Sequence, residues 1–199
     1  MNLKIASGIT VIVGRSGAGK TTLLRRLAGL EGIASPYRSV GYVTQEPYLF
    51  PHLSVQENVL FGYRRVPKEK RIFTDGEVID WLNIRPLLER DIPKLSGGER
   101  QRIVIARSVL MSPEILLMDE PVSALDCISK AEVLNALLHL RQKINIPILY
   151  VTHNESELVR LADQVILLKS GKIALQGSLE ALWDNATFLQ ETGFTPPLK

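Results

Sequence analysis

The chain has 199 residues, enough to bury one sizeable core, and we expect one domain with a small insert rather than several domains. Its hydrophobic fraction of 45% and charged fraction of 23% are those of an ordinary globular protein, which excludes a disordered or low-complexity chain. The net charge of +3 is spread along the sequence, so no nucleic-acid partner is expected.

The sequence also argues against disulfides and membrane spans. The single cysteine, Cys127, excludes an internal disulfide and fits a reducing compartment; we interpret it as an incidental small residue. No stretch approaches the roughly 18 apolar residues of a membrane-spanning helix, and residues 1–7 lack the apolar centre of a signal peptide. We therefore expect a soluble, cytoplasmic chain that depends on other chains for any membrane part.

The first predicted elements are a strand, a glycine-rich loop and a helix. An apolar, β-branched run at residues 9–13 predicts the strand, and leucines at helical spacing predict a helix over residues 20–30. The loop between them fits the phosphate-loop pattern, in which glycines let backbone amides encircle an anion at a helix N-terminus. Lys20 would add charge at the β- and γ-phosphates, and Thr21 a hydroxyl for Mg²⁺. We therefore expect ATP and Mg²⁺ to bind, with these ATP-binding residues: Gly14, Arg15, Ser16, Gly17, Ala18, Gly19, Lys20, Thr21 and Thr22.

Helical patterns dominate the middle of the chain. The expected elements are a strand at 40–44, helices at 54–61, 74–82 and 97–111, and a basic surface loop at 64–71. Ser54 and Glu57 have the spacing of a capping box at the start of the first of these helices. We expect a helical insert over residues 54–112 in a nucleotide-binding core formed by residues 1–53 and 113–199.

Strands and helices alternate again in the last part of the chain. The expected elements are strands at 115–118, 146–152, 165–168 and 172–175 and helices at 129–144, from 155, and at 179–183, with a turn at Gly171. Such alternation predicts an α/β fold with a largely parallel, buried sheet.

Two adjacent carboxylates, Asp119 and Glu120, end the apolar strand at 115–118. Buried carboxylates are costly without a metal or a positive partner, so we expect Asp119 to act on Mg²⁺. Strand alternation would send Glu120 to the other side, where it could polarise an attacking water as a general base. The alternative is a structural ion pair with Lys20.

A set of motifs resembles that of ABC ATPases in order and approximate spacing. It consists of the phosphate loop, Gln45, Leu95-Ser96-Gly97-Gly98-Glu99-Arg100-Gln101, Asp119-Glu120-Pro121, Ser123-Ala124-Leu125-Asp126 and His153. The resemblance covers nearly the whole chain and implies a P-loop NTPase core that hydrolyses ATP by in-line attack of water on the γ-phosphate. It implies that Gln45 contacts Mg²⁺ and the attacking water and that His153 holds the γ-phosphate. The expected catalytic residues are then Glu120, His153 and Gln45, and the expected metal ligands Thr21, Gln45 and Asp119.

The signature, residues 95–101, stands at the start of a predicted helix. Ser96, Gly97 and Gly98 would form a second anion site from a hydroxyl, amides and the helix dipole. The resemblance implies a head-to-tail dimer with a second ATPase subunit, expected to be identical, in which this segment and Gln101 close on the partner's ATP. Ser123 and Asp126 would lie at the same interface. The alternative is a simple helix N-cap followed by a flexible glycine pair.

Residues 47–59 are similar to the stretch of bacterial import ATPases that receives the permease. The similarity implies that permease subunits contact the region from Gln45 to Asn58 through exposed Tyr48, Leu49 and Phe50, and that a solute-binding protein takes part indirectly. The alternative for these three side chains is core packing of the insert. The chain would then lie on the inner face of the membrane through the permease.

Residues 145–153 and 161–163 look most like those of ATPases for uptake of molybdate and related oxyanions, so ATP-driven solute import is the expected function. One alternative is a non-transport ABC ATPase acting on DNA or ribosomes; those usually carry coiled-coil inserts or tandem cassettes, and this sequence has neither. The other alternative is a regulatory nucleotide-binding module. His52 and His139 are interpreted as surface or packing residues.

The sequence departs from the family pattern in three places. Only 13 residues precede Gly14 and none is aromatic, so the residue that stacks on adenine is not found. Residues 29–40 are too few for the usual antiparallel strands, which predicts a reduced N-terminal subdomain, and no regulatory barrel follows Leu182. We therefore expect weak ATP affinity or poor base selectivity, with Tyr37 as a candidate substitute.

Overall fold

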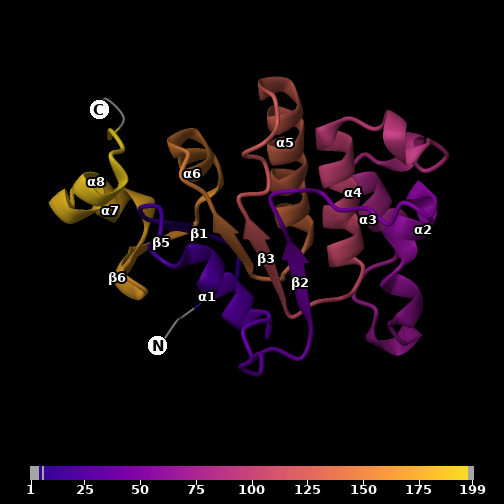
Figure 1. Ribbon diagram of the computed structural model, residues 1–199, viewed down its shortest axis with the longest axis horizontal. Coiled ribbons are helices and arrows are strands. Elements are labelled where there is room, and N and C mark those ends of the chain that lie inside the picture. Colours follow the sequence, from indigo (N-terminus) through magenta and orange to yellow (C-terminus); the bar gives the residue numbers. More distant parts are fainter. Residues whose placement is uncertain (1–4, 6, 197–199) are drawn as a thin grey trace.

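The computed structural model describes residue 5 and residues 7–196, so the prediction that residues 1–7 form no signal peptide lies almost wholly outside it. The described chain forms a six-stranded sheet in the order β2-β3-β4-β1-β5-β6 (Figure 1). The strands are β1 (Ile9–Val13), β2 (Val40–Val43), β3 (Ile115–Asp119), β4 (Ile148–Val151), β5 (Gln164–Lys169) and β6 (Lys172–Gly177). Neighbouring strands are parallel except β5 and β6, which confirms the expected, largely parallel α/β sheet.

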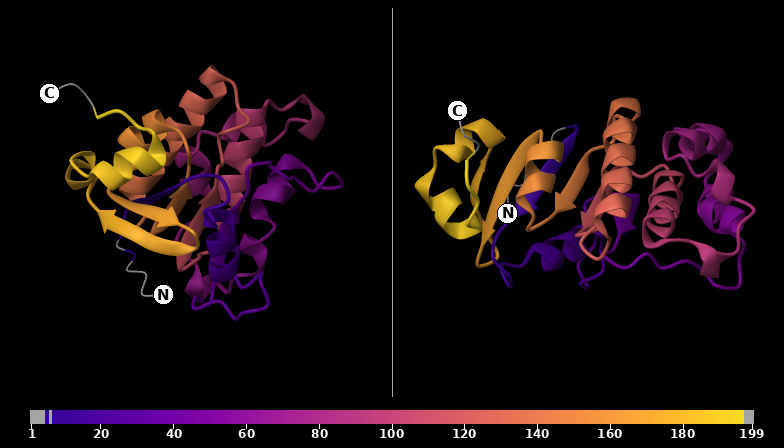
Figure 2. Two further views of the ribbon diagram at one scale, coloured as in Figure 1. Left: turned by 60° about the vertical axis from the view of Figure 1, so that its left-hand side comes forward. Right: turned by 90° about the horizontal axis from the view of Figure 1, so that it is seen from above.

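Helices cover both faces of this sheet and extend beyond one edge. They are α1 (Lys20–Leu27), α2 (Val55–Leu60), α3 (Asp75–Trp81), α4 (Gly97–Val109), α5 (Cys127–Lys143), α6 (Glu155–Leu161), α7 (Leu179–Trp183) and α8 (Ala186–Thr192). Short 3₁₀ turns occur at Tyr63–Arg65, Lys68–Lys70, Arg85–Leu87 and Ile92–Lys94. Figures 1 and 2 show α2, α3 and α4 beside β2 at one end of the molecule and α7 and α8 at the other.

The central strands are buried on both faces because their side chains alternate between two apolar clusters. In β3, Ile115 and Leu117 pack with Leu24 of α1, whereas Leu116 and Met118 belong to the cluster that contains α4, α5 and α6. The near-continuous apolar runs of the sequence are therefore those of a sheet covered on both sides.

Capping boxes begin the first two helices of residues 54–112, and the sequence predicts the first of these boxes. In α2, the Ser54 hydroxyl accepts from the amide of Glu57 and the Glu57 carboxylate accepts from the amide of Ser54, which confirms the predicted box. The same box, Thr74 with Glu77, begins α3. The helix α8 was missed, because it is short and follows α7 after two residues; Asn185 caps it by accepting from the amide of Phe188.

The predicted surface loop at 64–71 and the short segment after α1 are compact. The Arg71 guanidinium donates to the carbonyl of Val66 and lies 4.0 Å from the centre of the Tyr63 ring. Between α1 and β2 the described residues form no strand, and the Ser35 hydroxyl donates to the carbonyl of Leu27. This agrees with a reduced antiparallel subdomain. None of the helices in the described part of the chain is long and apolar enough to cross a membrane.

Candidate nucleotide-binding site

Four parallel strands bring the predicted site residues to one edge of the sheet. Gly14 follows β1, Gln45 follows β2 by two residues, Asp119 ends β3, and His153 follows β4 by two residues. The register pairs Val151 of β4 with both Asp119 and Ile12, so the neighbouring strands end at the same level. Carboxyl ends of parallel strands are the usual position of ligand sites in open α/β sheets.

The phosphate loop has a backbone that only glycine adopts easily. Gly14, Gly17 and Gly19 have φ values of 148°, 78° and 96°, in the left-handed region. A Cβ on Gly14 would collide with the carbonyl oxygen of Leu168 in β5. The amide of Gly171 donates to the carbonyl of Ala18 at 2.9 Å, so the β5–β6 turn supports the loop from outside.

Lys20 is buried within the loop that it completes. Its Nζ donates to the carbonyl oxygens of Gly14 at 2.7 Å and Arg15 at 3.1 Å. Burial lowers the pKa of Lys20, and the negative charges of Glu120 and Asp119 oppose that shift. The loop thus holds a partly desolvated cation beside the start of α1, where no side chain caps the helix.

Asp119 is held by two hydroxyls. Thr21 Oγ1 donates to Oδ1 at 3.2 Å, and the hydroxyl of Tyr42 in β2 donates to Oδ2 at 3.3 Å. Burial raises the pKa of Asp119, against the two hydrogen bonds. A hydroxyl and a carboxylate that meet in this way fit Mg²⁺, which prefers oxygen ligands and usually binds through one or two carboxylates together with phosphates. Tyr42 was not predicted; its role depends on β2 lying beside β3, which the sequence does not show.

Glu120 reaches the site by a backbone turn and not by strand alternation, which corrects the predicted reason for its position. The strand β3 ends at Asp119, and Glu120 has φ 48°, a left-handed conformation unusual for a non-glycine residue. Its amide donates to the carbonyl of Val151, and its Oε2 lies 3.1 Å from Nδ1 of His153. The alternative ion pair with Lys20 is not among the ion pairs of the described residues. Gln45 is exposed at the same edge.

The signature is distant in the sheet from the phosphate loop of its own chain. It begins α4, which packs against β2, whereas the loop follows β1, and β3 and β4 lie between these strands. Ser96 is the exposed N-cap of α4: its hydroxyl accepts from the amide of Glu99, and Glu99 Oε2 accepts from the amide of Ser96.

The two signature glycines allow close packing within the chain. A Cβ on Gly98 would lie 2.9 Å from Cβ of Ser129 in α5, and one on Gly97 would lie 2.9 Å from Cδ2 of Leu125. The predicted role of Gln101 at a partner's ATP does not fit this conformation, because its side chain is fully buried (0% exposed) and its Nε2 donates to the carbonyl of Thr44. The missed signal is position: Gln101 is one turn inside α4, on the face that packs against β2.

The predicted dimer-loop residues are exposed and shape the start of α5. The Ser123 hydroxyl donates to the carbonyl of Glu120 at 2.8 Å, and Asp126 caps α5 by accepting from the amides of Ile128 and Ser129. Hydrogen bonds from the hydroxyl and the amide of Ser129, with a smaller one from the amide of Ile128, lower the pKa of Asp126. Cys127 follows as an exposed free thiol.

The segment after Gln45 is less exposed than predicted. Of the three side chains expected to be exposed, Tyr48, Leu49 and Phe50, only Tyr48 is largely exposed, at 67%. Leu49 packs against the core, so the alternative of core packing holds for this side chain. The half-buried Phe50 has its ring centre 4.6 Å from that of Phe61. Buried Asn58 accepts from the Phe50 amide and donates to the Phe50 carbonyl, which fixes this segment against α2.

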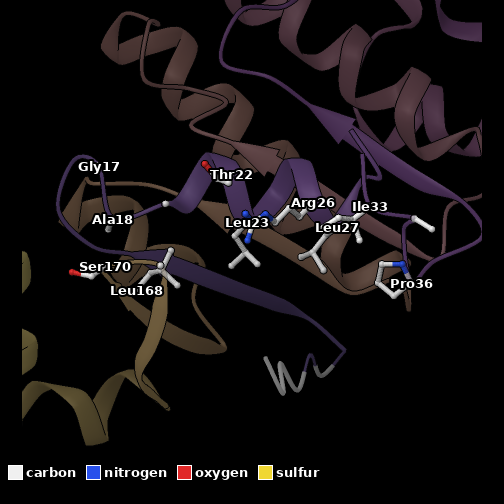
Figure 3. Close-up of a pocket in the computed structure, with 13 residues that line it drawn as sticks. Gly17, Ala18, Thr22, Leu23, Arg26, Leu27, Ile33, Pro36, Leu168 and Ser170 are labelled. Carbon is white, nitrogen blue, oxygen red and sulfur yellow. The ribbon is translucent and has the colours of Figure 1, made fainter. Parts of the chain in front are cut away.

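A cavity of about 580 Å³ runs from the phosphate loop along α1 (Figure 3). Its lining residues are Gly17, Ala18, Gly19, Thr22, Leu23, Arg26, Leu27, Ile33, Ala34, Pro36, Leu168, Ser170 and Gly171. None of them is aromatic, and Tyr37, the candidate substitute for the adenine-stacking residue, packs beside α1 without lining the cavity. On the other side of the loop, Arg15 pairs with Glu191 of α8 at 3.3 Å and donates to the carbonyl of Gln190.

The fold and this edge define a nucleoside triphosphate-binding domain of the P-loop class. Residues 1–123 match the family described as ABC transporter, and the chain belongs to that family. It is 44% identical over 194 residues to the molybdenum import ATP-binding protein ModC of Hahella chejuensis, covering 88% of this chain and 54% of that protein. It is 46% identical over 194 residues to ModC 1 of Azotobacter vinelandii, covering 87% and 54%.

The chain spans about half the length of these curated relatives. A solved chain of an ABC transporter assigned to the metal-chelate type, in an inward-facing conformation, has the same fold, with a TM-score of 0.77 and 28% identity over 98% of this chain and 83% of that chain.

Proposed function

We propose that the chain is the ATP-hydrolysing subunit of an ABC importer, with molybdate or a related oxyanion as the transported solute. The observation that carries the proposal is the convergence at one sheet edge of a buried lysine, a hydroxyl–carboxylate pair and the Glu120–His153 contact. The similarity of the chain to molybdenum import proteins favours a role in transport over action on DNA or ribosomes and over a regulatory module.

In this proposal each residue at the edge has one task. Lys20 would exchange its two carbonyl contacts for β- and γ-phosphate oxygens, and the amides of the loop would surround the same phosphates. Thr21 and Asp119, with Gln45, would hold Mg²⁺, which neutralises charge on the phosphates when bound. Glu120 would accept the proton of the water that attacks the γ-phosphorus, as the bond to ADP breaks, and His153 would hold the transferred group.

Each site would be completed by a second copy of the chain. The signature is separated from its own phosphate loop by two strands, yet Ser96 and Gly97 are exposed. A head-to-tail dimer would bring them to the partner's ATP, with Ser123 and Asp126 at the seam. We propose that residues 54–112 act as the moving subdomain in this closure and that permease subunits contact the surface around Tyr48. The complex would lie at the inner face of the membrane and receive solute from a binding protein.

The first test compares wild type with Glu120→Gln and Lys20→Ala. Wild type should release phosphate from ATP, and Glu120→Gln should lose this activity by at least about 100-fold while retaining ATP and forming a dimer in light scattering. Lys20→Ala should neither bind ATP nor dimerise. Wild type without phosphate release, or Glu120→Gln that remains monomeric with ATP, would contradict the proposal.

The solute requires a second experiment. The chain, reconstituted with its permease and binding protein in vesicles, should show ATP hydrolysis stimulated by molybdate. Stimulation by sulfate alone would replace molybdate with a related oxyanion, and stimulation by neither anion would overturn the oxyanion assignment while leaving the ATPase intact.

Base selectivity is a separate part of the proposal. None of the described residues that line the cavity beside the phosphate loop is aromatic, so stacking worth roughly 1–3 kcal/mol per base would be lost for ATP and GTP alike. We expect weak binding of both nucleotides, with dissociation constants within about tenfold of each other. Titration calorimetry with both nucleotides measures this ratio, and strong preference for ATP would contradict it.

A further inference from the structure

Glu157 of α6 is a buried carboxylate with three side-chain partners. Only 2% of it is exposed. Its Oε2 accepts hydrogen bonds from the hydroxyl of Tyr150 at 2.8 Å and that of Thr152 at 2.7 Å, and its Oε1 lies 2.5 Å from Nζ of Lys130 in α5. The roles proposed above make no use of this group.

These partners satisfy the charge and fix the direction of each hydrogen bond. Taking a carboxylate out of water is costly unless it is paired and hydrogen-bonded, and here an ammonium and two hydroxyls provide that compensation. Burial, together with the Glu157 charge, raises the pKa of Tyr150 well above its usual value, so its hydroxyl donates. The Thr152 hydroxyl also gives its hydrogen to Glu157, which leaves its lone pairs to accept from elsewhere.

The group that Thr152 accepts from is the amide of Asn154, at 3.0 Å. Asn154 is fixed a second time, because its Oδ1 caps α6 by accepting from the amides of Ser156 and Glu157. His153 therefore lies between two residues whose positions depend on Glu157, although its own side chain is 66% exposed and contacts Glu120. The network holds the histidine turn from inside the protein.

The same carboxylate reaches toward the dimer loop. Lys130 lies in the first turns of α5, four residues after its N-cap Asp126, and the amide of Lys130 donates to the carbonyl of Asp126. A displacement at the start of α5 would thus be transmitted through Lys130 and Glu157 to Thr152. An apolar residue in place of Glu157 could fill the same space but could not bind both Lys130 and Thr152.

We propose that Glu157 is a positioning residue for His153, which orients the histidine turn through Thr152 and ties it to the start of α5 through Lys130. The proposal rests on the proposed function in one respect, that His153 acts on the γ-phosphate of ATP.

The test uses two variants that each remove one hydroxyl from the same carboxylate oxygen. Thr152→Val breaks the link to the Asn154 amide, whereas the matched control Tyr150→Phe leaves that link intact. The chain has three histidines, so the imidazole cross-peak of His153 is followed by NMR at fixed pH with His52 and His139 as internal references. Phosphate release supplies kcat and KM for ATP in parallel.

Thr152→Val should move the His153 cross-peak and lower kcat about tenfold with KM within about twofold, since small misplacements of reacting groups are expensive. Tyr150→Phe should leave the His153 cross-peak and kcat near wild type, even if its melting temperature falls as much as that of Thr152→Val. Thr152→Ser, which retains the hydroxyl, should restore both readouts.

Equal shifts of the His153 cross-peak in Thr152→Val and Tyr150→Phe, or no shift in either, would overturn the proposal. Glu157 would then contribute only to the packing of the protein. Should Thr152→Val fail to fold, Glu157→Gln keeps the shape without the charge, and it should move the same cross-peak. If wild type hydrolyses no ATP, the proposed function fails, while the cross-peak comparison still decides whether Glu157 positions His153.

Discussion

The starts of α1 and α4 are two helix N-termini that the sequence assigns to phosphate, yet they are built differently. At α1 the N-cap is Gly19, no side chain caps the helix, and no acidic residue stands in the first turn. At α4 Ser96 and Glu99 form a complete capping box, and Glu99 also pairs with Arg90 at 3.1 Å. One helix start is left for a ligand to stabilise, whereas the other is stabilised by its own side chains. A role of α4 at a partner's phosphate would therefore depend on the Ser96 hydroxyl and the exposed backbone at Gly97.

Of the predicted changes, removal of Lys20 should have the largest effect on activity, and its effects on activity and on stability should have opposite signs. Lys20→Met should lower ATP hydrolysis by at least about 100-fold, because a desolvated charge at the phosphates is lost. It should also raise the melting temperature of the nucleotide-free protein, because burial disfavours the ammonium. Calorimetry and phosphate release measure the two effects. The exposed Lys172→Met is the control, and a fall in melting temperature for Lys20→Met would show that Lys20 stabilises the empty loop.

Ser96 variants separate capping from ligand binding at α4. Ser96→Asp keeps a good N-cap but places a negative charge where the partner's phosphate is expected, so hydrolysis should fall about tenfold or more while stability remains near wild type. Ser96→Ala, in contrast to Ser96→Asp, removes the cap and should therefore also lower the stability of the protein by about 1 kcal/mol. Full ATPase activity in Ser96→Asp would mean that α4 never meets a phosphate.

The signature glycines should differ in what a methyl group costs. Gly98→Ala forces Cβ against the Ser129 Cβ and backbone and should destabilise the protein by about 1–3 kcal/mol. Gly97→Ala meets only the end of the Leu125 side chain, which can move, so it should cost less than about 1 kcal/mol. Urea unfolding of both variants checks the order, and equal losses would rule out close packing as the difference between them.

The smallest effect concerns pH and the capping box of α3. Hydrogen bonds from the amide and hydroxyl of Thr74 lower the pKa of Glu77. Because the folded pKa lies below the unfolded value of about 4.3, this contribution to stability is present above that pH and is lost as pH falls through the folded pKa. Glu77→Gln should therefore show a shallower decline in melting temperature between about pH 5 and 3 than wild type. An identical decline would show that the box contributes no pH dependence.

The local parts of the site could be predicted from the sequence, and the parts that depend on neighbouring strands could not. The phosphate loop and the Ser54–Glu57 capping box depend on residues close in the chain, and their patterns located them, whereas the boxes that begin α3 and α4 were not predicted although they have the same spacing. The Tyr42–Asp119 contact requires β2 to lie beside β3, and the contact of Lys130 with Glu157 requires α5 to pack on α6. The turn at Glu120 was missed because the apolar pattern gave the length of β3 without the left-handed residue after it.

The contact between Arg15 and α8 makes the boundary chosen for a recombinant clone an experimental variable. Glu191 neutralises both Arg15, in the phosphate loop, and Lys169, at the end of β5. A clone that stops after α7 would leave two uncompensated positive charges beside the nucleotide site. We expect this shorter clone to bind any nucleotide polyphosphate more tightly at low salt than a clone that keeps α8. We also expect its affinity to fall more steeply as salt is added.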